Sequence, residues 1–448
     1  MVGTRLSKSP SVNSLPSVAY GCLTSVPARA VVRLFLCSGS DYRKERGTTI
    51  NLSDFTRFCT DKFDLRLKAQ NLFEPRKRPE IPISRIFLLV VGALALRKQS
   101  FHQIDLFARN QGAKKWLGTR RSMVASDATL WRVLPQMNRL ELRGLVHQAY
   151  RLLRKKGHGK LDLPSGRKIR AAAVDGTCWG KRYASAVEMI ADAPVVLDFE
   201  PSAGEGHELA TSDALLRRVF YQFHDLEGGL ADIVLGDGIY ITQQMLRLCR
   251  YELGTHLLVK TTELDSLLIL KDAEALFNTA ADGTPGIERQ RGLDAERGLS
   301  YEIWAAAGFE HADFEEKLKV ARVRIQPLKG EEEAETFWVI TTDTTLSGPD
   351  MRELAHRRWA IENHGFRALN DAMNSKHVWT RGKNSEDTFE VLMLMMILSF
   401  MLVVAYHAQV DPDALWEKLR LRRLTLRHLA EDWLMTLYEA IPLWEDAG

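Results

Sequence analysis

Residues 354–373 read LAHRRWAIENHGFRALNDAM, and the side chains on one side of an α-helix formed by this stretch are nearly all apolar. This stripe consists of Ala355, Trp359, Glu362, Phe366, Leu369 and Met373. A carboxylate that faces a core is costly unless it is neutralised, paired or bound to a metal. Arg358, one turn before Glu362, offers an ordinary ion pair. The alternative is that Glu362 belongs to a site shared with distant acids.

Two aspartates upstream each follow a predicted strand. Ile169–Val174 reads as a strand that ends at Asp175, and Ala231–Gly236 reads as a buried strand that ends at Asp237. Ligands of open α/β sheets bind outside the carboxyl ends of the strands. If the two strands are neighbours and the helix of Glu362 packs across them, three carboxylates meet. The alternative is that each Asp-Gly pair is an ordinary turn.

Three neighbouring carboxylates remain ionised together only beside a cation. Oxygen ligands favour hard divalent metals, and Mg²⁺ leaves room for water and phosphate oxygens. Two such ions, roughly 3.5 to 4 Å apart, can activate a water or a 3′-hydroxyl and stabilise the leaving oxygen in a displacement at phosphorus. The pattern therefore favours phosphoryl transfer as the chemistry of this site.

Composition limits the class of protein. The net charge of +4 over 448 residues permits a nucleic-acid partner without requiring one. Five scattered cysteines, none in a CxxC pair, exclude a disulfide framework and a zinc ribbon and favour the reducing cytoplasm. The apolar run Val391–Ala405 is short for a membrane span and contains Ser399, so we expect a buried core helix. Val31–Cys37 lacks the layout of a signal peptide, and no membrane partner is expected.

Local patterns predict helices before residue 155 and alternating strands and helices after it, as in an α/β protein whose sheet has a parallel part. We expect helices over Asn51–Gln70 and Ser84–Lys98, a break at Gly112–Trp116, and a helix that begins at an N-cap formed by Ser126. A plain scaffold and a DNA-binding module both fit the helical region.

Three segments resemble the acidic motifs of bacterial insertion-sequence DDE transposases, in the branch with a Y-R-E-K signature around the glutamate. They are Val174–Thr177 (VDGT), Leu235–Tyr240 (LGDGIY), and Arg358–Asn363 (RWAIEN) with Gly365, Phe366 and Leu369 behind it. The resemblance covers roughly residues 80 to 410 and includes the Ser-Asp-Ala-Thr-Leu sequence at 126–130. Two positions depart from the signature: Ala355 stands where the family has tyrosine, and Leu369 or Asn370 where it has lysine.

The resemblance implies an RNase H-like mixed sheet flanked by helices, with cut-and-paste transposition as the activity. It implies that Asp175, Asp237 and Glu362 are the catalytic residues and bind two Mg²⁺ ions, for which Mn²⁺ can substitute. The implied partners are the terminal inverted repeats of the element and its target DNA, with a homodimer in the DNA complex. The implied location is the bacterial cytoplasm, in association with the nucleoid.

The resulting organisation has six parts. Residues 1–48 form a disordered or dispensable extension, 49–158 a helical domain that binds DNA ends, 159–263 the first part of the catalytic core, 264–335 a β-rich insertion, 336–410 the second part of the core, and 411–448 the C-terminal helices.

Five further residues are candidates for DNA contact. The resemblance assigns Arg358 to a DNA phosphate near the site. Lys260 and Arg322 lie on predicted strands and either face DNA or belong to solvated strand faces. Trp304 and Trp338 either stack on a flipped base or belong to the core. Two other functions compete with transposition: a catalytically inactive DNA-binding protein of transposase descent, and a metal-dependent nuclease without strand transfer.

Overall fold

A computed structural model describes residues 52–410 of the chain, with gaps at 120–124, 192–194, 265–266, 296, 313, 329–333, 360 and 383. The predicted extension 1–48 and the predicted C-terminal helices 411–448 lie outside the described residues.

The protein is a mixed α/β protein whose described part contains a ten-stranded mixed sheet. The strands are β1 (Lys160–Asp162), β2 (Lys168–Trp179), β3 (Arg182–Ile190), β4 (Val195–Pro201), β5 (Ile233–Asp237), β6 (His256–Thr261), β7 (Ile287–Asp294), β8 (Leu299–His311), β9 (Phe314–Pro327) and β10 (Glu335–Thr341). Their order is β4-β3-β2-β5-β6-β10-β9-β8-β7, and β1 pairs with β2 at the side.

Strand direction divides the sheet into three regions. β2, β3 and β4 are antiparallel, as successive neighbours along the chain commonly are. β2, β5 and β6 are parallel, and the short apolar β5 is buried between its neighbours. β10 pairs antiparallel with both β6 and β9. The strands of residues 287–327 therefore extend the main sheet through continuous backbone hydrogen bonding.

Helices precede, cover and follow the sheet. They are α2 (Leu52–Asp61), α3 (Leu65–Gln70), α4 (Ile83–Ala95), α5 (Phe101–Ala108), α6 (Gln111–Leu117), α7 (Asp127–Val133), η1 (Leu134–Gln136), α8 (Arg139–Lys155), α9 (Glu208–Gln222), η2 (Gly238–Tyr240), α10 (Gln243–Arg247), η3 (Leu248–Glu252), α11 (Leu268–Thr279), α12 (Gly348–Arg358), η4 (Ile361–Phe366), α13 (Arg367–Met373) and α14 (Ser385–Val410). The helix and N-cap expected at Ser126 are confirmed, because its side chain accepts a hydrogen bond from the Thr129 amide.

Three local expectations are corrected. The helix predicted over Asn51–Gln70 is divided in two, and Asp64 between the halves has a left-handed backbone with a φ of 52°. The predicted break at Gly112–Trp116 is instead helix α6, which Asn110 caps. β2 does not end at Asp175 but continues to Trp179, because it keeps its pairing with β3.

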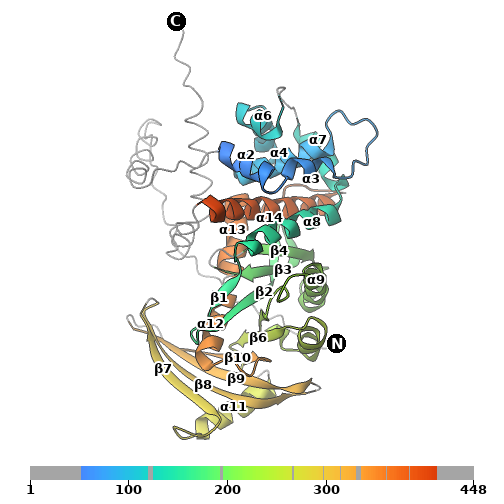
Figure 1. Cartoon of the computed structure of the whole chain (residues 1–448). Helices are drawn as coiled ribbons and strands as arrows, with labels where there is room; N and C mark the ends of the chain where they lie inside the picture. The colour runs from blue at the N-terminus through green and yellow to red at the C-terminus, as the bar shows by residue number, and fades with distance from the viewer. Residues whose placement is uncertain are drawn as a thin grey trace, which may run out of the picture. The chain divides into compact units, whose positions relative to one another are not determined.

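α14 is the central helix of the described chain and lies between the N-terminal helices and β4 (Figure 1). The segment Ser385–Tyr406 is long and apolar enough to cross a membrane, and 89% of its most apolar window is buried inside the protein. The burial expected for Val391–Ala405 is confirmed. Within α14, the Ser399 hydroxyl donates to the Val91 carbonyl of α4 at 3.1 Å.

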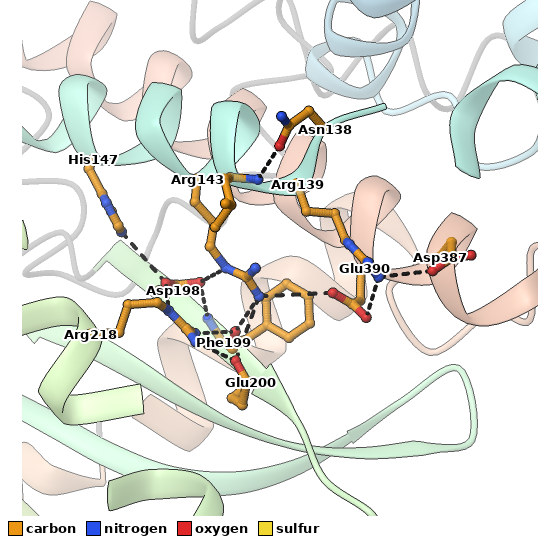
Figure 2. Close-up of polar contacts among 11 residues, drawn as sticks. Asn138, Arg139, Arg143, His147, Asp198, Phe199, Glu200, Arg218, Asp387 and Glu390 are labelled. Carbon is orange, nitrogen blue, oxygen red and sulfur yellow. Dashed lines mark hydrogen bonds and ion pairs between the residues drawn. The ribbon is translucent and has the colours of Figure 1, made fainter. Parts of the chain in front are cut away.

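A buried ion network joins α8 to the sheet (Figure 2). Asp198 of β4 is fully buried, 3.1 Å from Arg143 Nε, 2.9 Å from Arg218 Nε and 3.6 Å from His147 Nε2. Burial alone would raise the pKa of Asp198, but the neighbouring His147 and the charges of the two arginines lower that pKa to about 2. The ionised carboxylate therefore holds α8 and α9 against the same strand.

Candidate active site

The two aspartates lie near the same end of two neighbouring strands in the interior of the sheet. β2 and β5 are parallel neighbours, and Ala171–Ala173 pair with Ile233–Leu235, so the first condition for the meeting of the carboxylates is met. Asp237 is the last residue of β5, and Asp175 follows the last β2 residue that pairs with β5 by two positions. Asp237 Oδ1 accepts from the Ile239 amide at 3.1 Å, which fixes its carboxylate at the start of η2.

Arg358 links Asp175 to Glu362. Its Nη2 is 2.8 Å from Glu362 Oε1, and its Nη1 is 3.5 Å from Asp175 Oδ2. The expected i,i+4 pair therefore forms, and the same guanidinium also reaches the strand. Acids from β2 and η4, far apart in the sequence, are brought to one cation.

The expectation that Glu362 is buried on an apolar stripe is wrong. Its side chain is 43% exposed, and Trp359 is 52% exposed, whereas Phe366, Leu369 and Met373 are buried as expected. The reason is that the predicted continuous helix changes into a π-helical turn at Ile361–Phe366. A π-turn contains more residues than an α-turn and therefore shifts the helical register at Glu362; such turns often occur at functional sites.

Burial and mutual repulsion alter the titration of the aspartates. Burial is the main cause that raises the pKa of Asp175 to about 7; Arg358 opposes this rise, and the charges of Glu362, Asp237 and Glu208 add to it. Burial also raises the pKa of Asp237, again with contributions from Glu208 and Glu362. The three predicted acids therefore lie close enough to repel one another, and a cation would relieve that repulsion.

The carboxylates are suitable donors for a hard divalent cation. Among the described residues, no group of three Asp, Glu, His or Cys side chains is placed to hold a metal ion. Arg358 supplies positive charge between Asp175 and Glu362 instead. The metal-binding role of Asp175, Asp237 and Glu362 remains a prediction.

Lys260 lies beside the acids. It is the β6 partner of Asp237 in the parallel pairing, and its Nζ is 4.3 Å from the centre of the Phe337 ring and 3.8 Å from Glu335. Burial lowers its pKa, while Glu335 and Glu362 oppose that change. This lysine is therefore a half-buried neighbour of the site rather than part of a solvated strand face.

The aromatic candidates form a packed row across β8, β9 and β10. Arg322 is the cross-strand partner of both Trp304 and Trp338, and its guanidinium lies 4.2 Å from the centre of the Trp304 ring. Trp338 is 3% exposed and stacks on Phe277, so its assignment as a base-stacking residue is corrected: it is a core residue. Trp304 is half-buried, and Arg289 also lies against its ring at 5.2 Å.

Sequence reasoning missed two glutamates near Asp175. Glu208 begins α9, and its Oε1 accepts a hydrogen bond from the Tyr240 hydroxyl at 2.7 Å. No sequence signal distinguishes it from an ordinary acid in the first turn of a helix. Its charge nevertheless acts on both Asp175 and Asp237.

Glu188 is the other missed acid. It lies in β3 opposite Ala173, is fully buried, and neither of its carboxyl oxygens has a hydrogen-bond partner in the described structure. Burial raises its pKa well above the usual range, and the charge of Asp175 adds to the rise. A Cβ on Gly365 of η4 would collide with its carboxyl group. The signal that sequence reasoning passed over is a lone charge within the apolar strand segment 184–190.

The departures from the transposase signature are packing residues. Ala355, at the tyrosine position, and Leu369, at one of the two lysine positions, are both fully buried.

No protein-family model matches the chain, and no curated protein matches it. The resemblance to DDE transposases therefore stands on the three acidic motifs themselves.

Proposed function

We propose that this chain is a DDE-type DNA transposase that cleaves the ends of an insertion sequence and joins them to target DNA. The observation that carries the proposal is the meeting of Asp175 and Glu362 at the guanidinium of Arg358, beside Asp237 at the edge of the sheet. Asp175, Glu362 and Asp237 are the same three acids that the sequence motifs identify.

The sheet supports an RNase H-like core for this function. The strands β4-β3-β2-β5-β6 are antiparallel over the first three and parallel over the last three. Asp237 ends β5, and Asp175 lies in β2 two residues beyond its pairing with β5, so both aspartates lie at the carboxyl-terminal edge of this parallel pairing. That edge is where ligands of open sheets bind. α9 and the α12–η4–α13 segment contribute to the site from outside the sheet.

Asp175, Asp237 and Glu362 would hold Mg²⁺ or Mn²⁺, which supplies an activated oxygen nucleophile and charge stabilisation at phosphorus when bound. The chain's own residues position the acids. Arg358 keeps Asp175 and Glu362 together, and the Ile239 amide orients Asp237. When DNA is bound, Arg358 contacts a phosphate, for which a bidentate guanidinium is well suited.

The proposal extends to the partners of the reaction. The helical segment 49–158 would bind the terminal inverted repeats, and a homodimer would pair the two ends. Basic side chains in the described part of this segment, such as Arg132 and Lys114, supply the charge that phosphate binding needs.

The test uses the DNA that flanks the reading frame. Its terminal repeats, made as labelled duplexes, are incubated with the full-length protein, supercoiled plasmid and Mg²⁺. We expect labelled 3′-ends to be joined to the plasmid. Asp237→Asn should abolish cleavage and joining, whereas Asp162→Asn, a change at an exposed carboxylate of β1, should leave both intact.

The results separate the three candidate functions. End binding without cleavage in any divalent metal would identify an inactive DNA-binding protein. Cleavage without joining would identify a nuclease. Wild-type activity in Asp237→Asn would remove the catalytic assignment of that residue.

A further inference from the structure

We propose that the basic segment 151–170 forms a separate DNA-binding surface, which contacts the phosphate backbone of duplex DNA away from the three acids. This segment covers the end of α8, strand β1 and the start of β2. The inference goes beyond the proposed function, because it requires neither the acids nor a terminal repeat.

Positive charge is concentrated in this segment. It reads RLLRKKGHGKLDLPSGRKIR, with eight basic residues and one acid, Asp162, and so carries a net charge of +7. The whole chain carries +4, and subtracting +7 leaves −3 for all other residues together. Such a concentration of one sign of charge in an otherwise slightly acidic protein is typical of a surface that binds a polyanion.

The pairing of β1 with β2 brings basic side chains onto one face. Lys160 lies opposite Arg170, and Lys168 lies two residues before Arg170 in the same strand. Leu161 and Ile169, which point the other way, are buried. Lys160, Lys168 and Arg170 therefore share the opposite face, where both lysines are exposed.

Arg154 connects the end of α8 to this face. Its guanidinium donates to three backbone carbonyls of the loop between α9 and β5, at 2.6, 2.8 and 3.0 Å. Arg170 reaches the same loop, since its Nη1 would lie 3.5 Å from a Cβ on Gly228. Lys155 and Lys156, which follow Arg154, are thereby placed beside the basic face of β1 and β2.

Three exposed lysines of this surface have no carboxylate partner. Among the described residues, Lys155, Lys156 and Lys160 form no ion pair. Of the neighbouring acids, Asp225 is already paired with Arg151 at 2.7 Å. The unpaired lysines are therefore available to neutralise phosphates and to release the counter-ions condensed on DNA.

The composition of the segment favours duplex DNA over a single strand or a membrane. The segment contains no Phe, Tyr or Trp on which an unpaired base could stack. None of the exposed large apolar side chains of the described chain lies within it, and contact with a membrane interface needs such side chains. A surface of lysine and arginine matches the phosphates of a duplex, which are contacted without reading the bases.

The surface lies away from the acids. Asp175 follows Lys168 by seven residues in β2, which is about 23 Å at the usual rise of a strand. Because successive strand residues point to opposite faces, Lys168 and Arg170 lie on the face opposite that of the Asp175 side chain. The duplex bound here is therefore a different stretch of DNA from the one at the acids.

The experiment measures binding of a fluorescent random-sequence duplex to the full-length protein by anisotropy, in EDTA and over a series of salt concentrations. The variant combines Lys156→Gln with Lys160→Gln. We expect weaker binding at low salt and a plot of log affinity against log salt that is shallower by about 1.8, or about 0.9 for each lost phosphate contact. The matched control combines Lys271→Gln with Lys317→Gln, two exposed lysines of the β-rich insertion, and should keep the wild-type slope.

Every other outcome overturns the proposal. An unchanged slope in the Lys156→Gln, Lys160→Gln protein would make the segment an ordinary solvated surface. An equal change in the control pair would attribute binding to net charge alone. A loss confined to single-stranded DNA, or to vesicles that contain phosphatidylserine, would assign the surface to that ligand in place of the duplex.

These results are distinguishable from a failure of the proposed function. Asp237→Asn should bind the random-sequence duplex as the wild type does, because no metal is present and the acids take no part. A wild-type protein that binds this duplex with the expected slope but cleaves no DNA in Mg²⁺ would refute the proposed catalysis and leave the surface standing.

Discussion

Asp175→Asn should make the metal-free protein more stable at neutral and alkaline pH. The pKa of Asp175 is raised from 3.8 to about 7, mainly by burial. A carboxyl group with a raised pKa contributes stability that is fully present below pH 3.8 and is lost as pH rises through about 7. Each pKa unit is worth about 1.4 kcal/mol, so the loss approaches about 4 kcal/mol at most. The neutral amide of the variant does not undergo this loss of stability. We expect the free energy of unfolding to rise by only about 2 kcal/mol, because the amide interacts less strongly with Arg358 than the carboxylate does.

The assay is urea unfolding in EDTA at a series of pH values. The free energy of unfolding of the wild type should fall relative to that of Asp175→Asn from about pH 4 to pH 7 and then stay parallel to it. Asp162→Asn, at an exposed carboxylate, should follow the wild type throughout. Adding Mg²⁺ should stabilise the wild type but not Asp175→Asn, by RT ln(1 + [L]/Kd). A less stable Asp175→Asn at pH 8, or an offset that does not vary with pH, would refute the reasoning.

Three further changes test other contacts. Asp198→Asn should destabilise the fold by about 3 to 5 kcal/mol in urea unfolding, because it removes the fully buried counter-charge of Arg143 and Arg218 and leaves them only the partly exposed Glu200 and Glu390; a loss below about 1 kcal/mol would contradict the network's role. Gly365→Ala should lower the melting temperature and cleavage together, because its Cβ would collide with Glu188; normal cleavage would show that η4 yields without cost. Arg358→Ala should weaken binding of end DNA and reduce the salt dependence of that binding by about one phosphate contact; an unchanged slope in a salt titration would remove the phosphate role.

The strands, helices and N-cap that depend on local sequence patterns were predictable from the sequence. The apolar runs that form β5 and α14 were recognised without knowledge of their partners, because full burial produces continuous apolar sequence. The N-cap at Ser126 follows from side-chain chemistry alone. Asp237 was placed correctly at a strand end for the same reason: the apolar run stops there.

The path of the chain around Glu362 was not predictable from periodicity. An α-helical period assigns Trp359 and Glu362 to the buried stripe, but both side chains are exposed, and Glu362 lies in a π-turn. No local sequence feature of residues 361–366 predicts that turn. Gly365 of this turn packs against Glu188, which lies far away in the sequence.

The neighbours of the acids depend on tertiary contacts in the same way. Glu208 looks like any acid at a helix start, and its place in the site depends on the Tyr240 hydroxyl and on the missing side chain of Gly176. Trp338 and Trp304 were each open to a core or a DNA role, and the packing of Trp338 on Phe277 of α11 places Trp338 in the core.

The position of α14 has a consequence for synthesis of the protein. α4 and α8, made early, pack on a helix that begins at Ser385. A nascent chain therefore exposes the apolar surface of these early helices until the ribosome has passed residue 410, and release of a shorter product leaves them without their central support. We expect fragments that stop before Ser385 to aggregate or be degraded, so that the folded protein is confined to molecules translated through the last acidic motif.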